Sequence, residues 1–500
     1  MESNVRVRFA PSPTGPLHIG GVRTALYNYL FAKKHNGTFI LRIEDTDQTR
    51  YVANAEQYII DALQWCSIPF DEGPNTNEKF GPYRQSERKE LYKKYADKLI
   101  ETGWAYYAFD TAEDLDALRK QHEAEGKTFI YNWHNHDEVQ NRINPETSGG
   151  EKFVVRFKTP QDQTLILEDE IRGTIKIDTN TLDDKILFKS DGMPTYHLAN
   201  IVDDHLMEIS HVIRGEEWLP SLPLHSLLYR AFGWESPKFA HLPLILKPVG
   251  KAYTNESTSD VSRGYKEDGY FADAFINMLA FLGWNPGTEQ EIFSLEELIK
   301  EFDLKRVSKS GAKFSPDKTN WFQQQYMQQK SDVELTDLYL PLLEEKGIVI
   351  ANGMKQSLDD KKITSSKTPR YDVAYVKKVV SSIKERAVFV NDFWSLSSFF
   401  FETPKEYDAK ASKKNWKPET GSLMNELIEV IDNIQDFSSE NTEKIIKEWI
   451  SGKEIGFGKV MQPLRLSLVG KLAGPHLFDI IAMIGKEETI KRIKNAIKKL

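Results

Sequence analysis

Hydrophobic and polar residues follow two different periods along the chain. Val5 to Phe9 alternates apolar and polar positions, Val22 to Lys34 repeats apolar residues with helical spacing, and Thr38 to Arg42 is rich in β-branched and aromatic residues. A strand, a helix and a second strand in this order predict a βαβ unit. From Tyr265 onward the apolar positions recur almost wholly with the period of a helix. The pattern therefore predicts an α/β domain first and an all-α body in the second half.

A different pattern interrupts the α/β part between Tyr106 and Asp191. Three strand-like segments lie there: Lys152 to Lys158, Thr164 to Leu167 and Thr174 to Ile177. Apolar strand and helix patterns return from Met193 to Pro248, so the sequence predicts an α+β insertion after which the first sheet resumes. Val249 to Gly264 is rich in Ser, Thr, Asn and Gly, which predicts an exposed loop.

The size and composition are those of an ordinary globular protein. The 500 residues predict about three domains, and 40% hydrophobic with 28% charged residues exclude disordered and fibrous classes. Apolar runs such as Ile480 to Ile484 are far shorter than the ~20 residues of a membrane helix. The N-terminus has no basic region followed by an apolar one, so we expect a cytoplasmic protein. The single cysteine, Cys66, excludes an internal disulfide and a zinc site built from several cysteines.

The net charge of -8 argues against attraction of nucleic acid to the whole chain, so a polyanion must bind locally. Two basic stretches in the last third are candidates. Lys361 to Arg386 holds eight Lys and Arg against two acidic residues, and Lys486 to Lys499 holds six against two. Charge alone equally fits solvated helix faces.

The segment from Ala10 to Leu26 joins the first strand to the first helix, where α/β sheets bind ligands. Gly20 and Gly21 remove Cβ atoms where a backbone approaches a phosphate or a base at the start of a helix. His18 lies beside this glycine pair and can donate hydrogen bonds to phosphoryl oxygens. The alternative is a tight turn in which His18 merely packs.

The string Pro-Leu-His-Ile-Gly-Gly, which ends at Gly21, is similar to the HIGH signature of class I aminoacyl-tRNA synthetases, and the chain resembles the glutamyl-tRNA synthetase family of that class. Further similarity, in the family's order and distances, covers these segments: Arg6 to Gly21, Ile40 to Asp47, Lys189 to His205, Val212 to Ser221, Gly311 to Phe314 and Gln462 to Leu466. The resemblance therefore extends over nearly the whole chain.

The resemblance implies an α/β Rossmann-type catalytic domain with an α+β insertion, followed by an all-α region that binds tRNA and its anticodon. The implied boundaries are residues 1–105 and 191–255 for the two halves of the catalytic domain, 106–190 for the inserted acceptor-binding domain, 256–330 for a helical stem-contact domain and 331–500 for the anticodon-binding domain. We expect a monomer.

The activity that the resemblance implies joins L-glutamate to ATP as an adenylate and then to tRNA(Glu), with ATP accompanied by Mg²⁺ and no protein metal ligand. No protein nucleophile is needed, so catalysis is mostly positioning and electrostatics. The implied glutamate site consists of Arg8, Ala10, Ser12, Glu44, Tyr196, Asn200 and Arg214. The implied ATP site consists of His18, Gly20, Gly21, Gly215, Glu217, Trp218 and Ile245.

Some of these residues also have a plainer interpretation. Arg8 alternates with apolar neighbours and fits a solvent-facing strand position. Glu44, Asp45 and Asp47 fit a solvated turn or a Mg²⁺ site. Tyr196 lies one helical turn before Asn200, so packing alone explains it.

The chain departs from the family where a Lys-Met-Ser-Lys-Ser-like loop is expected to neutralise the triphosphate. The stretch from Lys247 to Tyr265 has no Leu-Ser-Lys-Arg and is shorter than the family's. Lys251 is the only lysine between Pro248 and Tyr265, so we expect Lys251 or Lys247 to substitute partly, with Lys251 assigned as catalytic beside His18. Val307 to Ser310 is rejected as a substitute, because similar family members keep the true loop as well.

The predicted tRNA contacts are basic residues of the last third of the chain, together with Lys309 from the segment Val307 to Ser310. Arginine can stack on splayed bases and bind their edges. The residues are Lys309, Lys377, Lys378, Arg386 and Arg465, with Lys384 in the same stretch. The insertion lacks the cysteines that hold zinc in some relatives, so we expect aromatic packing around Trp104 and no zinc.

The sequence is consistent with three functions. The first is a working glutamyl-tRNA synthetase. The second is a relative that binds tRNA and ATP but activates glutamate weakly or not at all, because the loop is absent. The third, from another class, is a nucleotide-binding protein with the same first fold.

Overall fold

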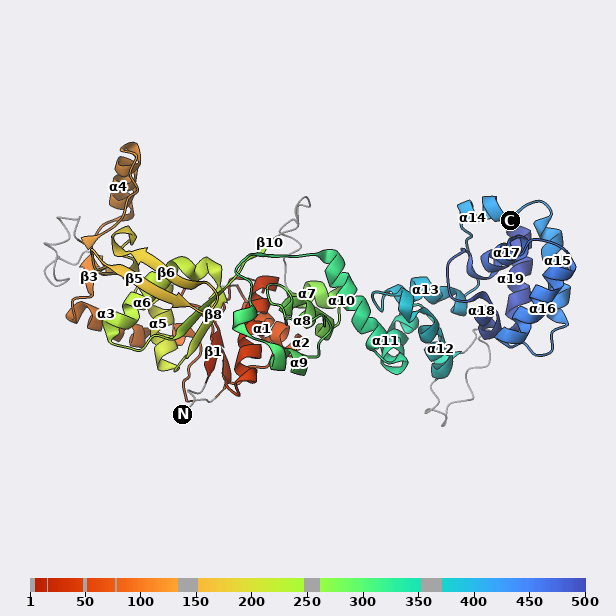
Figure 1. Ribbon diagram of the computed structural model, residues 1–500, viewed down its shortest axis with the longest axis horizontal. Helices are drawn as coiled ribbons and strands as arrows, with labels where there is room; N and C mark the ends of the chain where they lie inside the picture. Colours follow the sequence, from red (N-terminus) through yellow and green to blue (C-terminus); the bar gives the residue numbers. More distant parts are fainter. Residues whose placement is uncertain are drawn as a thin grey trace. The chain divides into compact units, whose positions relative to one another are not determined.

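The computed structural model describes residues 5–15, 17–47, 52–76, 79–133, 152–246, 261–351 and 371–500. The chain forms two compact units, Met1–Phe322 and Gln323–Leu500. All the strands labelled in Figure 1 belong to the first unit. Within the described part of the chain, no helix is long and apolar enough to cross a membrane.

The first unit opens with the expected strand, helix and strand. β1 (Arg6–Phe9) and β2 (Thr38–Leu41) pair in parallel, and α1 (Ile19–Lys34) connects them. α1 begins three residues before the predicted helix, because His18 caps its first turn by accepting a hydrogen bond from the Gly21 N–H group. Two glycines weaken the helical pattern of that turn, and the cap offsets their low helix propensity.

A second parallel pair continues this arrangement. β8 (His211–Gly215) pairs with β9 (Lys238–Leu242), and α6 (Leu222–Phe232) connects them. The Ser210 N–H group donates to the Arg6 carbonyl at 2.9 Å, which joins the beginning of β8 to the beginning of β1. The carboxyl ends of β1 and β8 therefore meet at one edge, where α/β proteins bind ligands. α5 (Tyr196–Leu206) leads into β8.

The inserted segment contains two separate strand groups. β3 (Ala105–Ala108), β4 (Val154–Phe157) and β7 (Ile186–Phe188) form an antiparallel sheet. The hairpin of β5 (Thr164–Asp169) and β6 (Gly173–Asp178) instead joins the sheet of β8 and β9, in the order β6-β5-β9-β8. Local periodicity predicts β4, β5 and β6 but not β3 or β7, and it does not reveal which distant strand each one pairs with.

Helices surround the strands of the first unit. They are α2 (Ala55–Trp65), α3 (Lys89–Glu101), α4 (Ala112–Ala124), α7 (Val261–Glu267), α8 (Ala272–Ala280) and α9 (Leu295–Glu301). α4 has no buried residue and projects from the strands in Figure 1. A short parallel pair, β10 (Ile245–Leu246) and β11 (Ala312–Lys313), completes the unit.

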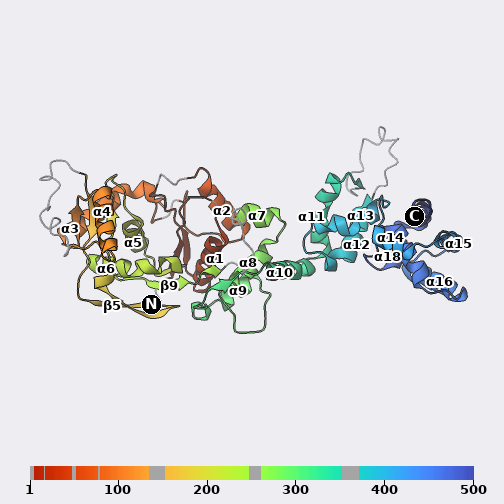
Figure 2. The same cartoon turned by 90° about the horizontal axis from the view of Figure 1, so that it is seen from above.

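Side chains of α1 hold the helical segment that follows residue 261. Figures 1 and 2 show α8 beside α1. The Tyr27 hydroxyl donates to the Ala280 carbonyl at 3.0 Å, and Arg23 donates to the Leu282 carbonyl at 2.9 Å. Both acceptors lie at the end of α8, where carbonyl groups lack helical partners. α1 therefore packs between the strands and α8.

Where the structure describes it, the second unit is helical apart from the short parallel pair of β12 (Ile350–Ala351) and β13 (Tyr371–Asp372). α10 (Pro316–Gln329) runs from the first unit into the second. The remaining helices are α11 (Asp332–Glu345), α12 (Val373–Ile383), α13 (Asp392–Phe401), α14 (Ala409–Asn415), α15 (Thr420–Asp432), α16 (Ser439–Gly452), α17 (Gly458–Val469), α18 (Leu477–Ile484) and α19 (Lys486–Lys499).

Candidate active site

A cavity of about 950 Å³ lies at the carboxyl ends of β1 and β8, over the beginning of α1. All fourteen residues predicted for the glutamate and ATP sites line it. They are Arg8, Ala10, Ser12, His18, Gly20, Gly21, Glu44, Tyr196, Asn200, Arg214, Gly215, Glu217, Trp218 and Ile245. The structure thus brings together residues that are up to 237 positions apart, although their individual roles stay predictions.

His18 is exposed at the rim of this cavity. Its Nδ1 atom accepts a hydrogen bond from the Gly21 N–H group at 3.2 Å, so a neutral ring carries its proton on Nε2. A Cβ atom on Gly20 would lie 3.1 Å from the His18 ring, and one on Gly21 would lie 2.5 Å from the Leu17 side chain. The glycine pair therefore leaves room for the His18 and Leu17 side chains to fold back over the helix. The sequence prediction instead assigned this room to a phosphate or a base.

A buried network of charged residues forms one wall. Arg42, which is fully buried, donates to Asp204 at 2.7 Å and to Glu44 at 3.0 Å. Arg8 binds the same aspartate with two hydrogen bonds, from Nε at 3.0 Å and Nη2 at 3.1 Å. Sequence reasoning missed Arg42 and Asp204. The available signal was that Asp204 follows Asn200 by one helical turn on the face that meets the cavity.

Glu44 accepts hydrogen bonds from Arg42 and from the Asn200 amide, the latter at 3.0 Å. Burial raises the pKa of the Glu44 carboxyl group, although Arg42 and Arg8 act against that rise. The Asn200 side-chain oxygen is buried and has no hydrogen-bond partner within the described structure. A buried acceptor without a donor is costly, so this oxygen is suited to receive a donor from a ligand.

Arg214 projects into the cavity from the end of β8 and is held by neutral groups. Nε donates to His241 Nε2 at 3.0 Å, and Nη1 lies 3.0 Å from the Tyr196 hydroxyl and 3.1 Å from His225 Nδ1. Among the described residues, no carboxylate forms an ion pair with Arg214. Sequence reasoning also missed His225 and His241.

The two arginines proposed as cations therefore differ in their electrostatic state. Burial raises the pKa of Asp204, but Arg8 and Arg42 outweigh burial and lower it, so this aspartate is ionised and neutralises Arg8. Arg214 keeps a positive charge that no protein carboxylate offsets within the described part. A guanidinium in this state binds a carboxylate through two parallel hydrogen bonds.

The acid next to Glu44, Asp45, serves the fold. Asp45 accepts hydrogen bonds from the Ser86 N–H group at 2.8 Å and from its hydroxyl group at 2.6 Å. Of the residues that the structure describes, no group of three or more His, Cys, Asp or Glu is arranged to hold a metal ion. The expected aromatic packing is present in the insertion, where Trp104 stacks on Phe157 and Tyr106 contacts Trp133.

Comparison with known proteins identifies the family. The model "tRNA synthetases class I (E and Q), catalytic domain" matches residues 4–321, and "Anticodon binding domain" matches residues 334–497. The glutamate–tRNA ligase of Flavobacterium johnsoniae is 60% identical, with 100% of both chains covered. The chain belongs to the class I tRNA synthetases of the glutamate and glutamine type. A glutamate tRNA ligase from Elizabethkingia meningosepticum, crystallised in complex with its amino acid, has a TM-score of 0.88 at 47% identity, with 100% of both chains covered.

Relatives of the synthetase contain residues that it lacks. Its alignment with the Flavobacterium johnsoniae protein extends over 523 positions, whereas the chain has 500 residues, so the relative contains residues that this chain lacks. The ligase of Bacteroides fragilis, 49% identical, aligns over 527 positions. Lys247 and Lys251 lie outside the described residues.

The predicted tRNA contacts of the synthetase lie at several places. Lys309 is exposed in the first unit, and its ammonium group lies 3.4 Å from the Arg172 carbonyl. Lys377 and Lys378 are exposed on α12. Burial lowers the pKa of Arg465, and the charge of Arg386 lowers it further. Lys384 forms an ion pair with Asp332 at 2.9 Å. Because this carboxylate offsets its charge, Lys384 is a weaker candidate for a tRNA contact.

Proposed function

We propose that this synthetase joins L-glutamate to tRNA(Glu) in two steps, using ATP. In the first step the glutamate α-carboxylate attacks the α-phosphorus of ATP and diphosphate leaves. In the second step the terminal ribose hydroxyl of the tRNA attacks the acyl carbon and AMP leaves. The observation that carries the proposal is the unneutralised Arg214 guanidinium, which shares one cavity with the capped beginning of α1.

The polar groups of the cavity account for each part of glutamate. Arg214 binds the side-chain carboxylate, and its fixed charge prefers a carboxylate to the amide of glutamine. Glu44 and the unpartnered Asn200 oxygen accept hydrogen bonds from the ammonium group. Arg8 supports this site by holding Asp204 in place instead of binding the carboxylate directly, and Arg42 holds both Asp204 and Glu44.

The beginning of α1 lies on the ATP side of the cavity. The Nε2–H group of His18 faces away from the helix and donates to a phosphoryl oxygen as negative charge develops there. Mg²⁺ arrives with ATP and is held by the nucleotide. Gly215, Glu217, Trp218 and Ile245 line the same side. The enzyme works as a monomer in the cytoplasm.

The helical second unit reads the anticodon, and the insertion at 106–190 binds the acceptor end. The match of residues 334–497 to an anticodon-binding model supports the first assignment. Residues 256–330 contact the tRNA stem, with Lys309 near its inner bend. Arg386 and Arg465 are the strongest base-reading candidates, because the positive charge of Arg386 acts on Arg465 and a polyanion would offset this repulsion.

Diphosphate exchange into ATP tests the proposed function. We expect exchange that requires glutamate and tRNA(Glu), with glutamine and aspartate as matched controls that give none. Binding of tRNA without exchange would instead support the weakened relative. Exchange with another acid and no tRNA binding would support the nucleotide-binding protein of another class.

The shortened stretch after Leu246 makes the rate of this exchange informative. Loss of a lysine that faces the developing charge costs ~3 kcal/mol, roughly a hundredfold in rate. If Lys251 substitutes for it, Lys251→Ala lowers the exchange rate by about a further tenfold. Lys247→Ala tests the other candidate lysine in the same way. An unchanged rate in Lys251→Ala would remove Lys251 from the catalytic residues.

A further inference from the structure

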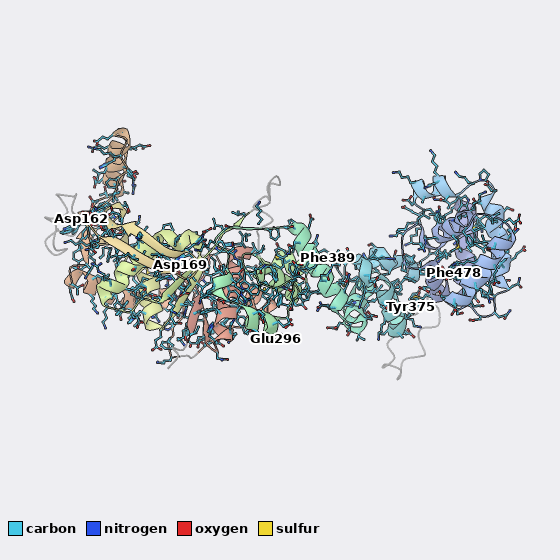
Figure 3. All side chains as sticks on the ribbon, in the orientation of Figure 1. Asp162, Asp169, Glu296, Tyr375, Phe389 and Phe478 are labelled. Carbon is cyan, nitrogen blue, oxygen red and sulfur yellow. The ribbon has the colours of Figure 1, made fainter. Side chains whose placement is uncertain are left out.

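Three polar side chains form a buried line beneath the candidate glutamate site. Asp169 ends β5 and is labelled in Figure 3, His241 lies in β9, and Arg214 lies directly opposite His241 in β8. Asp169 Oδ2 is 2.6 Å from His241 Nδ1, and His241 Nε2 is 3.0 Å from Arg214 Nε. The side chains of Asp169 and His241 are fully buried.

The hydrogen bonds determine which atoms of Asp169, His241 and Arg214 carry protons. Asp169 Oδ1 accepts from the backbone N–H groups of Ile171 at 3.0 Å and Arg172 at 2.7 Å. Burial alone raises the pKa of Asp169, but the His241 hydrogen bond and these N–H groups lower it overall, so the group is a carboxylate. A carboxylate only accepts, so His241 carries a proton on Nδ1.

The other ring nitrogen of His241 must therefore be an acceptor. Arg214 Nε always carries a proton, so His241 Nε2 presents its lone pair to that donor. Burial lowers the pKa of His241, and the Arg214 charge opposes a second ring proton. The aspartate thus selects the one tautomer of a neutral histidine that can hold Arg214.

Holding an arginine through a histidine has an electrostatic consequence. Arg8, which binds Asp204 directly, has its charge neutralised at a distance of 3.0 Å. Arg214 reaches Asp169 only through the His241 ring, so it is oriented without a carboxylate in contact with its guanidinium. Its charge stays available for a ligand.

We propose that Asp169 and His241 are positioning residues that fix the Arg214 guanidinium for the side-chain carboxylate of glutamate. This inference rests on the proposed function, which makes Arg214 the glutamate-selecting cation. Neither residue touches the substrate; both act through Arg214.

Asp169→Asn tests the proposal with almost no change in shape. The backbone N–H groups of Ile171 and Arg172 keep the amide oxygen at the Oδ1 position. The amide NH₂ group then faces His241 Nδ1, which must accept, so the ring proton moves to Nε2 and opposes the Arg214 N–H group. We expect glutamate affinity, measured by calorimetry on the full chain, to fall about 10- to 100-fold. ATP affinity stays unchanged.

Substitution of His241 separates the tautomer from general packing. A glutamine at 241 places an amide oxygen three bonds from Cβ, as His241 places Nε2, so His241→Gln keeps an acceptor for Arg214. We expect His241→Gln to bind glutamate within about threefold of the unsubstituted chain, and His241→Phe to lose about as much as Asp169→Asn. In the His241→Gln background, Asp169→Asn has little further effect because an amide can rotate to keep its oxygen toward Arg214. Glu168→Gln, next to Asp169 but exposed, is the neutral control.

The outcomes distinguish the two proposals. If the unsubstituted chain binds glutamate and Asp169→Asn binds it equally well, this inference is overturned and the proposed function stands. If the unsubstituted chain binds no glutamate, both are overturned. Equal losses of glutamate and ATP affinity, or loss of folding in every variant, indicate a purely structural role and overturn the inference. The ¹⁵N spectrum of His241, assigned by its loss in His241→Gln, must show the Nδ1–H tautomer; an Nε2–H signal contradicts the proposal.

Discussion

The chemical behaviour of a residue in this protein depends on what its charge faces. Arg8 and Arg214 both line the cavity, yet Asp204 neutralises one while histidines and a tyrosine hydroxyl hold the other. A guanidinium surrounded by neutral acceptors loses water without gaining a counter-ion. In the proposed function a bound carboxylate supplies that counter-ion, so we expect substrate selection to depend on Arg214.

Arg214→Gln removes this charge and its forked geometry. Hydrogen bonds to charged groups contribute about 1.5–3 kcal/mol, so we expect glutamate affinity to fall roughly 10- to 150-fold. ATP affinity stays within about twofold, because the charge lies on the amino-acid side of the cavity. Calorimetric titration of the full chain measures both. Arg230→Gln, outside the cavity, is the matched control; equal glutamate binding by the two variants would contradict the role of Arg214.

At the scale of elements, short polar contacts determine where strands and helices join. The Thr38 N–H group donates to the Val5 carbonyl at 2.8 Å, which begins the β1–β2 pair directly after α1. A Cβ atom on Gly37 would lie 2.2 Å from that same carbonyl oxygen. The chain therefore needs glycine there to pass from helix to strand.

Gly37→Ala should destabilise the first unit by about 1–3 kcal/mol, the usual cost of forcing atoms into a packed site. Faster hydrogen exchange of the β1 and β2 amides is the measurement. Gly452→Ala, at the end of α16, meets no atom within 4 Å and serves as the control with little effect. Unchanged exchange in Gly37→Ala would show that the backbone adjusts without loss of pairing.

In the second unit, α19 is tied to its neighbours through Arg492. This buried arginine donates to the Phe399 carbonyl at 2.5 Å, the Leu468 carbonyl at 3.0 Å and the Glu488 carboxylate at 2.8 Å. Burial alone would raise the pKa of Glu488, but hydrogen bonds from Lys491, Thr403 and Arg492 lower it to about 2. The ionised carboxylate therefore stabilises the folded unit.

The lowered pKa of Glu488 predicts a pH dependence. Its stabilisation is fully present above the unfolded value of about 4.3 and is lost as the pH falls toward 2. Glu488→Gln should therefore speed hydrogen exchange in α19 at pH 6 and have a smaller effect near pH 3. Glu487→Gln, one position earlier, is the control. A difference that does not shrink with acidification would contradict the ion pair.

At the scale of the whole molecule, the net charge of -8 sets a limit on RNA binding. An acidic chain holds a polyanion only where basic side chains gather, so attraction must be local and sensitive to salt. The two compact units at Met1–Phe322 and Gln323–Leu500 correspond closely to the family matches at residues 4–321 and 334–497. Catalysis and anticodon reading thus have separate hydrophobic cores.

Binding of tRNA(Glu) should weaken linearly in a plot of log affinity against log salt concentration. If Lys377 contacts a phosphate, Lys377→Ala reduces the magnitude of that slope by about 1. Fluorescence titrations between about 50 and 200 mM salt measure it. Lys453→Ala, on the same unit but paired with Glu426, is the control. Binding that is insensitive to salt would contradict the placement of these contacts.

The sequence by itself indicated the family, the order of the main elements and fourteen of the residues that line the cavity, because nearly all of these residues lie in short motifs that resemble the family's; their individual roles stay predictions. It did not reveal which strand pairs with β5, which side chain neutralises Arg8 or what holds Arg214. Asp204 lies 196 residues from Arg8, and Asp169 lies 72 residues from His241. Only the tertiary structure decided these contacts. The free-energy cost of burying a charge is offset by whichever partner the folded strands bring within hydrogen-bonding distance, and no local sequence pattern encodes that partner.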